Sequence, residues 1–256
     1  MIVWDNQRPS LLDLTHLNRL LAIDSATDAL SLALLDERGC KSLHRIMPRQ
    51  HQQLLFSLLD ELLDGRKVSE LELQAIVYGR GPGSFTGLRI AVSAAQGLAF
   101  SLGIPVISVS SLETQVRTLL RTESIIQPVR IFSCIDARIG QVYGQWFDCD
   151  GSKLTARGDA FVAVPEAIEQ PASRSGDDEC RFLGVGSGLV FLNAMPEAIR
   201  EQATCWPDVL PEARDMFAPA LQALESGQAQ DPMLAAPDYV QTRIGWKTLA
   251  EQGRIA

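Results

Sequence analysis

A glycine-rich loop at residues 79–87 is the segment whose residue types best suit chemistry. It reads Gly-Arg-Gly-Pro-Gly-Ser-Phe-Thr-Gly and lies between a predicted strand over 74–78 and a predicted helix over 88–102. At such a junction the backbone N–H groups and the helix dipole attract an anion. The residues that could contact an anion are Gly81, Gly83, Ser84, Thr86 and Gly87.

Known functional patterns do not match this loop. A Walker A loop needs a lysine after its last glycine, and the dinucleotide-binding pattern needs two residues between its last two glycines, where this loop has three. The loop also differs from the G-x-S-x-G pattern of a serine nucleophile. The alternative to an anion site is therefore a tight turn in which Pro82 and the glycines fix the backbone and Ser84 or Thr86 caps the helix.

Side chains that could hold a metal are few and dispersed. His16, His44 and His51 are far apart in the sequence, and the five cysteines form no C-x-x-C pair. We therefore predict no metal site and buried free thiols rather than disulfides. Asp24 and Asp136 each end a predicted strand and could hold Mg²⁺ near a nucleotide, but an aspartate is also common in a strand-end turn. No catalytic set emerges from these residues.

Composition narrows the class of protein. The 256-residue chain is 46% apolar and 21% charged, as in ordinary globular proteins. Its net charge is −8 and it contains no basic run, so we do not expect it to hold a nucleic acid alone. Charged residues interrupt its start, and no apolar run approaches the roughly 18 residues of a membrane span. We expect a cytoplasmic protein that has no membrane association and serves any RNA pathway through a partner.

The order of predicted elements indicates an α/β protein with two mixed sheets. Strands over 20–24, 31–36 and 41–47 form a meander, and leucines at helical spacing over 51–64 predict a helix. The strand, glycine loop, helix and next strand (104–109) form a right-handed βαβ unit. Further predictions are helices over 111–121, 189–201, 212–226 and 244–252, strands over 129–135, 141–147 and 182–185, and a surface loop over 157–179 with one short helix from Pro165.

Both halves open with a strand that ends in an aspartate and begins a hairpin. This layout resembles the duplicated actin-like ATPase fold of the ASKHA, ribonuclease H-like class, with two mixed-sheet domains. The predicted division is an N-terminal extension over 1–19, a first domain over 20–126 and a more divergent second domain over 127–235. A C-terminal helix within 240–256 is expected to pack back on the first domain.

Residues 75–90, Ala-Ile-Val-Tyr-Gly-Arg-Gly-Pro-Gly-Ser-Phe-Thr-Gly-Leu-Arg-Ile, resemble the signature of the TsaB (YeaZ) family. The similarity runs from about Leu20 to Lys247, and it is dense in the first half but sparse between 151 and 231. Residues 1–19 have no counterpart. Other matching segments lie at 21–28, 48–51, 96–99, 103–106, 110–113, 135–138, 142–143, 237–240 and 245–247.

The resemblance implies a non-catalytic paralogue of TsaD, the catalytic subunit of a tRNA-modifying complex. TsaD carries the metal motif V-N-H-[LM]-E-G-H, and the matching stretch here, 109–115, reads Val-Ser-Ser-Leu-Glu-Thr-Gln. Ser111 and Gln115 thus stand where metal-binding histidines would be, and a hydroxyl and an amide are poor substitutes for two imidazoles. The resemblance therefore implies no metal and no catalytic residue.

The implied role is a scaffold or activating subunit for N6-threonylcarbamoyladenosine modification of the tRNA adenosine next to the anticodon. The implied partners are TsaD, by heterodimerisation, and the ATPase subunit TsaE, with tRNA contacted only through the complex. The chain alone is expected to form a homodimer and to bind no cofactor, although ATP or ADP could lie at the complex interface. The predicted partner surface comprises His51, Leu54, Leu55, Leu58, Leu62, Leu88, Val92, Ala95 and Ala99. The alternative is that these two helices simply cover their own sheet.

Two other functions compete with the scaffold. An autonomous ATP-dependent enzyme of the actin-like or sugar-kinase class is suggested by Asp24 and by glycine loops at Gly81 and Gly184. A peptidase is suggested by the historical glycoprotease label of the wider family. The absence of a triad or metal ligands in the sequence makes the peptidase the least favoured function.

Overall fold

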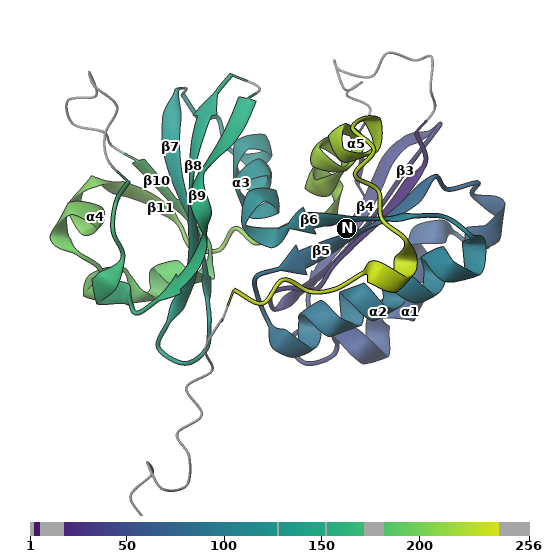
Figure 1. Ribbon diagram of the computed structural model, residues 1–256, viewed down its shortest axis with the longest axis horizontal. Helices are drawn as coiled ribbons and strands as arrows, with labels where there is room; N and C mark the ends of the chain where they lie inside the picture. The colour runs from purple at the N-terminus through teal and green to yellow at the C-terminus, as the bar shows by residue number, and fades with distance from the viewer. Residues whose placement is uncertain (1–2, 6–17, 127, 152, 172–181, 241–256) are drawn as a thin grey trace, which may run out of the picture.

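The chain forms two lobes, each built on one mixed sheet (Figure 1). The computed structural model describes residues 3–5, 18–126, 128–151, 153–171 and 182–240. Sheet A contains β1 (Val3–Asp5), β2 (Leu20–Asp24), β3 (Ala29–Asp36), β4 (Gly39–Ile46), β5 (Ala75–Gly81) and β6 (Val106–Ser110). Sheet B contains β7 (Val129–Asp136), β8 (Val142–Asp150), β9 (Lys153–Ala163), β10 (Phe182–Val185) and β11 (Ala203–Trp206).

The two sheets repeat one arrangement of strands. Sheet A has the order β1-β4-β3-β2-β5-β6 and sheet B the order β11-β10-β7-β8-β9. In each sheet three consecutive strands, β2–β4 or β7–β9, pair antiparallel. The first of the three also pairs in parallel with the fourth strand, β5 or β10, which pairs in parallel with the fifth, β6 or β11. This duplication confirms the predicted actin-like class, and β1 is an addition to the edge of sheet A.

Helices cover both faces of sheet A. On one face lie α1 (His51–Leu63) and α2 (Phe85–Leu102), whose leucines and small residues close the larger apolar core (Figure 1). By length and composition alone α2 could cross a membrane, but its inner face packs on β5, as in a core helix. The other face is covered by the 3₁₀ helix η4 (Ala213–Met216) and α5 (Phe217–Glu225).

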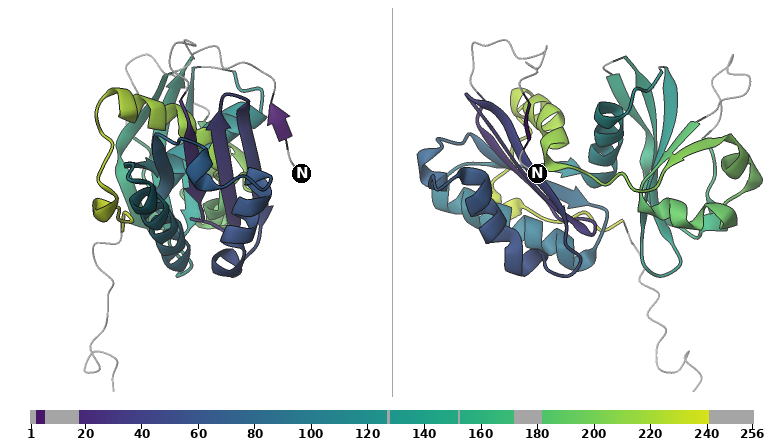
Figure 2. Two further views of the ribbon diagram at one scale, coloured as in Figure 1. Left: turned by 90° about the vertical axis from the view of Figure 1, so that its right-hand side faces the viewer. Right: turned by 180° about the vertical axis from the view of Figure 1, so that it is seen from behind.

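One helix, α3 (Ser111–Thr122), joins the two lobes. It follows β6, and Ser110 caps it by accepting a hydrogen bond from the Glu113 N–H. Its apolar side chains, among them Leu112 and Val116, pack on sheet B, so α3 lies between the sheets (Figures 1 and 2). The opposite face of sheet B is covered by the 3₁₀ helix η3 (Ser187–Ala194) and α4 (Glu197–Gln202). The remaining short 3₁₀ helices are η1 (Val68–Glu70), η2 (Pro165–Ala167) and η5 (Pro232–Leu234).

The predicted domain boundary at residue 235 is wrong. Residues 212–225, assigned from the sequence to the second domain, pack on sheet A of the first lobe, where Met216, Phe217 and Ala220 join its core. The N–H of Ala213 also donates to the Ser31 hydroxyl of β3, at 2.8 Å. Beyond this point Gln230 pairs with Val106 and η5 contacts α2. The order of elements along the chain does not reveal that α5 packs on sheet A, because the apolar face of α5 could cover either sheet.

Three further differences concern individual elements. Residues 153–163 form the edge strand β9, where a loop was predicted beyond residue 157, and β11 was not predicted at all. The helix predicted over 189–201 is interrupted before Pro196, because proline disfavours helical backbone in the residue before it. The short helix from Pro165 is confirmed. The helix predicted over 244–252, the packing of 240–256 and most of 1–19 lie outside the described residues.

Candidate functional site

The glycine loop lies where the sequence placed it, between β5 and α2. Ser84 is the residue that caps α2, because its hydroxyl accepts the N–H of Gly87 at 3.3 Å. The N–H of Ser84 itself donates to the carbonyl of Ala26 at 2.7 Å. The hydroxyl of Ser25 donates to the Gly87 carbonyl at 2.7 Å. The loop is thus bound to the turn that follows β2.

The glycines of this loop are required by close packing. A Cβ atom added to Gly79 would lie 1.9 Å from the Asp24 carboxylate, and one added to Gly87 would lie 1.9 Å from the Ser25 carbonyl. A Cβ at Gly83 would lie 2.2 Å from the Ala26 carbonyl. No heavier side chain fits at these distances. The turn after β2 therefore occupies the space against the loop.

This packing favours the structural interpretation of the loop over an anion site. Gly81, Gly83 and Gly87 are buried against the chain itself, whereas Ser84 and Thr86 are exposed. Two of the first N–H groups of α2 already have acceptors within the loop and turn. Anion contact at these five residues stays a prediction.

Asp24 is a fully buried carboxyl at the end of β2, opposite Gly79. Its Oδ1 accepts the N–H of Ala26 at 3.0 Å, and its Oδ2 accepts the hydroxyl of Ser111 at 3.1 Å. Burial raises the pKa of Asp24 from 3.8 to about 6, and these two hydrogen bonds oppose the rise. Ser111 is the first residue of α3, so this bond ties α3 to the end of β2.

Gln115, one turn further along α3, joins this helix to β7 and to the segment before η4. Its Oε1 accepts the hydroxyl of Ser133 on β7 at 2.8 Å, and its Nε2 donates to the carbonyl of Val209 at 2.9 Å. A Cβ added to Gly186, after β10, would lie 2.4 Å from the same amide nitrogen. The side chain is completely buried, and its amide is matched at both ends by groups of this chain.

A second contact between the lobes was not anticipated from the sequence. Asp28, which follows β2, forms an ion pair with Arg138 in the turn after β7. The Arg138 Nη2 donates to the Asp28 Oδ1 at 2.7 Å. Asp136 at the end of β7 accepts the N–H of Arg138 at 2.7 Å, the Asx-type contact that a strand-end aspartate makes with its own turn. Both residues of the ion pair are exposed, so it contributes at most about 1 kcal/mol.

The remaining candidate ligands do not converge. Within the described residues, no three His, Cys, Asp or Glu side chains are placed to hold a metal ion. His51 is buried at the start of α1, where its Nε2 lies 3.3 Å from the Asp28 carbonyl, and burial lowers the pKa of His44 on β4. Four of the five cysteines lie in the described part and none of these four forms a disulfide; Cys134 and Cys149 are buried, as predicted, whereas Cys40 and Cys205 are half-buried. Burial raises the pKa of Cys134, which makes it a poor nucleophile.

The nine side chains of the predicted partner surface lie on α1 and α2 but mostly face inward. Leu54 is half-buried, and the other eight are buried in the core of the first lobe. Their burial supports the alternative that they cover their own sheet. The outer surfaces of the same helices expose three large apolar side chains, Phe56 on α1 and Phe85 and Phe100 on α2. The interface itself stays a prediction.

Similarity to known proteins decides the family. The model of the TsaD family, described as tRNA N6-adenosine threonylcarbamoyltransferase, matches residues 44–241. The tRNA threonylcarbamoyladenosine biosynthesis protein TsaB of Escherichia coli (strain K12) is 34% identical over 237 residues, covering 90% of this chain and 98% of that protein. The chain belongs to the TsaB (YeaZ) family. TsaB of Bacillus subtilis is 37% identical over about half of each chain. The solved structure of YeaZ from Pseudomonas aeruginosa is 34% identical, with a TM-score of 0.77 over 87% of this chain and 99% of that one.

Membership of the TsaB family gives meaning to the contacts of Ser111 and Gln115. By the resemblance to the TsaD motif, the two residues correspond to its metal-binding histidines, and they lie one helical turn apart on α3. Here one is bonded to Asp24 and the other to Ser133 and Val209. Both side chains are therefore engaged by groups of this chain. The identities of the two residues were available from the sequence, but their partners were not.

Proposed function

We propose that the chain is a non-catalytic scaffold subunit in the biosynthesis of tRNA N6-threonylcarbamoyladenosine, and that it acts by heterodimerising with a TsaD-type catalytic subunit. The observation that carries the proposal is that the side chains of Asp24, Ser111 and Gln115 are all buried and hydrogen-bonded within the chain, which leaves none of the three directed at a substrate. The relatives named TsaB supply the pathway.

The proposal extends to the complex in which the subunit would act. A TsaE-type ATPase is the second partner, ATP or ADP lies at the complex interface, and tRNA is held by the complex rather than by this acidic chain. The modified adenosine is the one next to the anticodon. In the absence of TsaD the chain forms a homodimer in the cytoplasm.

We propose the outer surfaces of α1 and α2 as the partner-binding face. Phe56 is 59% exposed and Phe100 is 69% exposed, although both are large apolar side chains. Exposed aromatic side chains are enriched at protein interfaces, where their burial supplies much of the binding energy. The buried leucines behind them would then support the face without contacting the partner.

Co-elution with TsaD and tRNA modification by the reconstituted complex test the proposal. We expect co-elution, modification that requires this chain, and loss of both in Phe56→Asp and Phe100→Asp variants. Val190→Asp on η3 is the matched control, because Val190 is 70% exposed but lies on the other lobe. Modification that proceeds equally without the chain would contradict the scaffold role. Equal binding of all three variants to TsaD would contradict the proposed partner-binding face but would leave the scaffold role intact.

The competing function is an autonomous ATP-dependent enzyme, which Asp24 and the glycine loop would serve. Calorimetry of the isolated chain with ATP and Mg²⁺ separates the two functions. Turnover by the chain alone would favour the enzyme. Absence of binding agrees with the packing of the loop against Ser25 and Ala26.

A further inference from the structure

A cavity of about 380 Å³ lies between the lobes and shares no residue with the site described above. Its lining comes from α3, from the β8–β9 turn and strands beside it, and from η4 and α5. A volume of roughly 300–1,000 Å³ is typical of small-molecule sites. The cavity is therefore large enough for one small ligand that would contact both lobes.

Arginines dominate the polar lining of this cavity. Arg117 and Arg121 come from α3 and Arg214 from η4, whereas Asp215 is the one carboxylate among the lining residues. The chain as a whole has a net charge of −8, so three arginines in one cavity wall are unlike the rest of this acidic chain. Such a wall favours an anion, and guanidinium groups bind phosphate and carboxylate oxygens in pairs of parallel hydrogen bonds.

Two of the arginines are held in place by carboxylates, of which Glu113 and Glu212 lie outside the cavity lining and Asp215 within it. Arg117 donates from Nε and Nη2 to one oxygen of Glu113, at 2.9 and 2.8 Å. Arg121 pairs with Glu212 at 2.6 Å and also with Asp215 at 2.8 Å. The contacts of Arg117 with Glu113 occupy two of the five N–H donors that a guanidinium carries. Arg117 is thus oriented in advance and can take a second acceptor.

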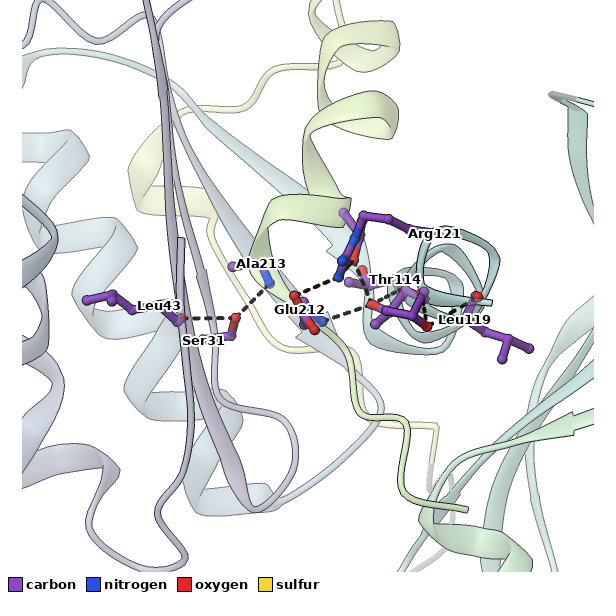
Figure 3. A network of polar contacts seen from close by, with 10 residues as sticks. Ser31, Leu43, Thr114, Leu119, Arg121, Glu212 and Ala213 are labelled. Carbon is purple, nitrogen blue, oxygen red and sulfur yellow. Dashed lines mark hydrogen bonds and ion pairs between the residues drawn. The ribbon is translucent and has the colours of Figure 1, made fainter. Parts of the chain in front are cut away.

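A polar network fixes this wall to sheet A (Figure 3). The hydroxyl of Thr118 on α3 donates to Asp215 at 2.8 Å and accepts the N–H of Glu212 at 3.1 Å. The next residue, Ala213, donates to Ser31 on β3. Segment 212–215 is therefore bonded on both sides, and the cavity wall is formed before any ligand arrives. Preorganisation of this kind reduces the entropy lost on binding.

The rest of the lining includes apolar side chains. Leu120 comes from α3, Leu154 from β9 and Ala218 from α5. A bare inorganic ion would leave these side chains uncovered, whereas a ligand with an apolar or aromatic body would bury them. We propose that the cavity binds a small organic phosphate, a phosphate monoester on an apolar or aromatic body such as a nucleoside monophosphate.

Calorimetry with three probes tests this proposal on the full chain. Adenosine 5′-monophosphate carries both the phosphate and the aromatic body, inorganic phosphate carries only the charge, and adenosine only the body. We expect the monophosphate to bind most tightly and its affinity to fall with added salt. Arg117→Gln should weaken it at least about tenfold, the effect of losing one charge-assisted hydrogen bond. Arg38→Gln, at an exposed arginine of the β3–β4 turn, is the charge-matched control and should bind as the wild type does.

Leu154→Asp provides an independent variant, because it adds a negative charge to the cavity without touching an arginine. It should abolish binding of the monophosphate, with circular dichroism and a thermal melt showing that both cavity variants remain folded. The proposal is overturned if the wild type binds no monophosphate at about 1 mM, a free energy of only about −4 kcal/mol. It is equally overturned if adenosine binds as tightly as its monophosphate, or if Arg38→Gln weakens binding as much as Arg117→Gln.

Discussion

Replacing Asp24 with asparagine should stabilise the protein at neutral and alkaline pH. Asp24 is 1% exposed, and its two hydrogen-bond donors, the Ala26 N–H and the Ser111 hydroxyl, carry no positive charge. Burial therefore raises the pKa of Asp24 to about 6. Asparagine keeps an oxygen for the Ala26 N–H and offers Ser111 an amide donor in place of an acceptor. The variant therefore retains the shape and the hydrogen bonds but removes the buried charge.

The magnitude follows from the shift in pKa. The change from 3.8 to about 6, at 1.36 kcal/mol per unit, corresponds to about 3 kcal/mol. Since the folded state holds the proton more tightly, this contribution favours folding fully below pH 3.8 and is lost as the pH rises through 6. The amide introduced by Asp24→Asn does not titrate in this range of pH. The difference in unfolding free energy between variant and wild type should thus increase by about 1–3 kcal/mol between pH 4 and pH 8.

Urea unfolding of both proteins at half-unit steps of pH measures this difference. Asp136→Asn is the matched control, because Asp136 ends the equivalent strand of sheet B but its side chain is 21% exposed to solvent. A difference that is independent of pH, or that decreases as pH rises, would refute the reasoning. The same variant tested with ATP and Mg²⁺ bears on function, since an ATP-dependent enzyme built on Asp24 would lose binding while it gained stability.

Four further substitutions test the packing, each by urea unfolding. Gly87→Ala should destabilise by at least about 2 kcal/mol because of backbone overlap, whereas Gly97→Ala on the open face of α2, where an added methyl meets no atom within 4 Å, should stabilise by about 0.5–1 kcal/mol. Gln115→Leu should cost about 1–3 kcal/mol, since it leaves a buried hydroxyl and a buried carbonyl unpaired, and an unchanged stability would show that the bridge contributes nothing. Thr118→Val keeps nearly the same side-chain shape but removes the hydroxyl that donates to Asp215. It should lower the unfolding free energy by a similar amount, and a gain in stability would contradict the role given to that network.

Helices and strands with a strong local pattern of apolar or capping residues were predicted from the sequence. The apolar strands β2 and β5, the leucines of α1 and a hydroxyl cap of α2, predicted at Ser84 or Thr86 and found at Ser84, all follow from residue types at short spacing. The edge strand β9 escaped because its polar, exposed residues from Lys153 onward lack the alternation of a half-buried strand. Its pairing with β8 is what makes it a strand.

Contacts between distant segments could not be predicted from spacing. The bond between Asp24 and Ser111 joins residues 87 positions apart, and the bond from Ala213 to Ser31 spans 182 positions. In the second case the sequence prediction placed the two residues in different domains. Each residue type is common in turns and helix starts, so nothing in the local pattern distinguishes a side chain that reaches another element from one that caps its own.

Gln115 also restricts how α3 can move. Gln115 is held at both ends of its amide, so its rotation toward an incoming ligand would break two buried hydrogen bonds and leave their partners unsatisfied, at about 1–3 kcal/mol each. The same bonds tie α3 to β7 and to the segment before η4, while Arg138 and Asp28 join the turns of the two lobes. Two-lobed proteins that close around a ligand do so by hinge or shear motion of one lobe against the other. In this chain α3 and the ion pair of Arg138 with Asp28 join the two lobes, which agrees with the scaffold role proposed above.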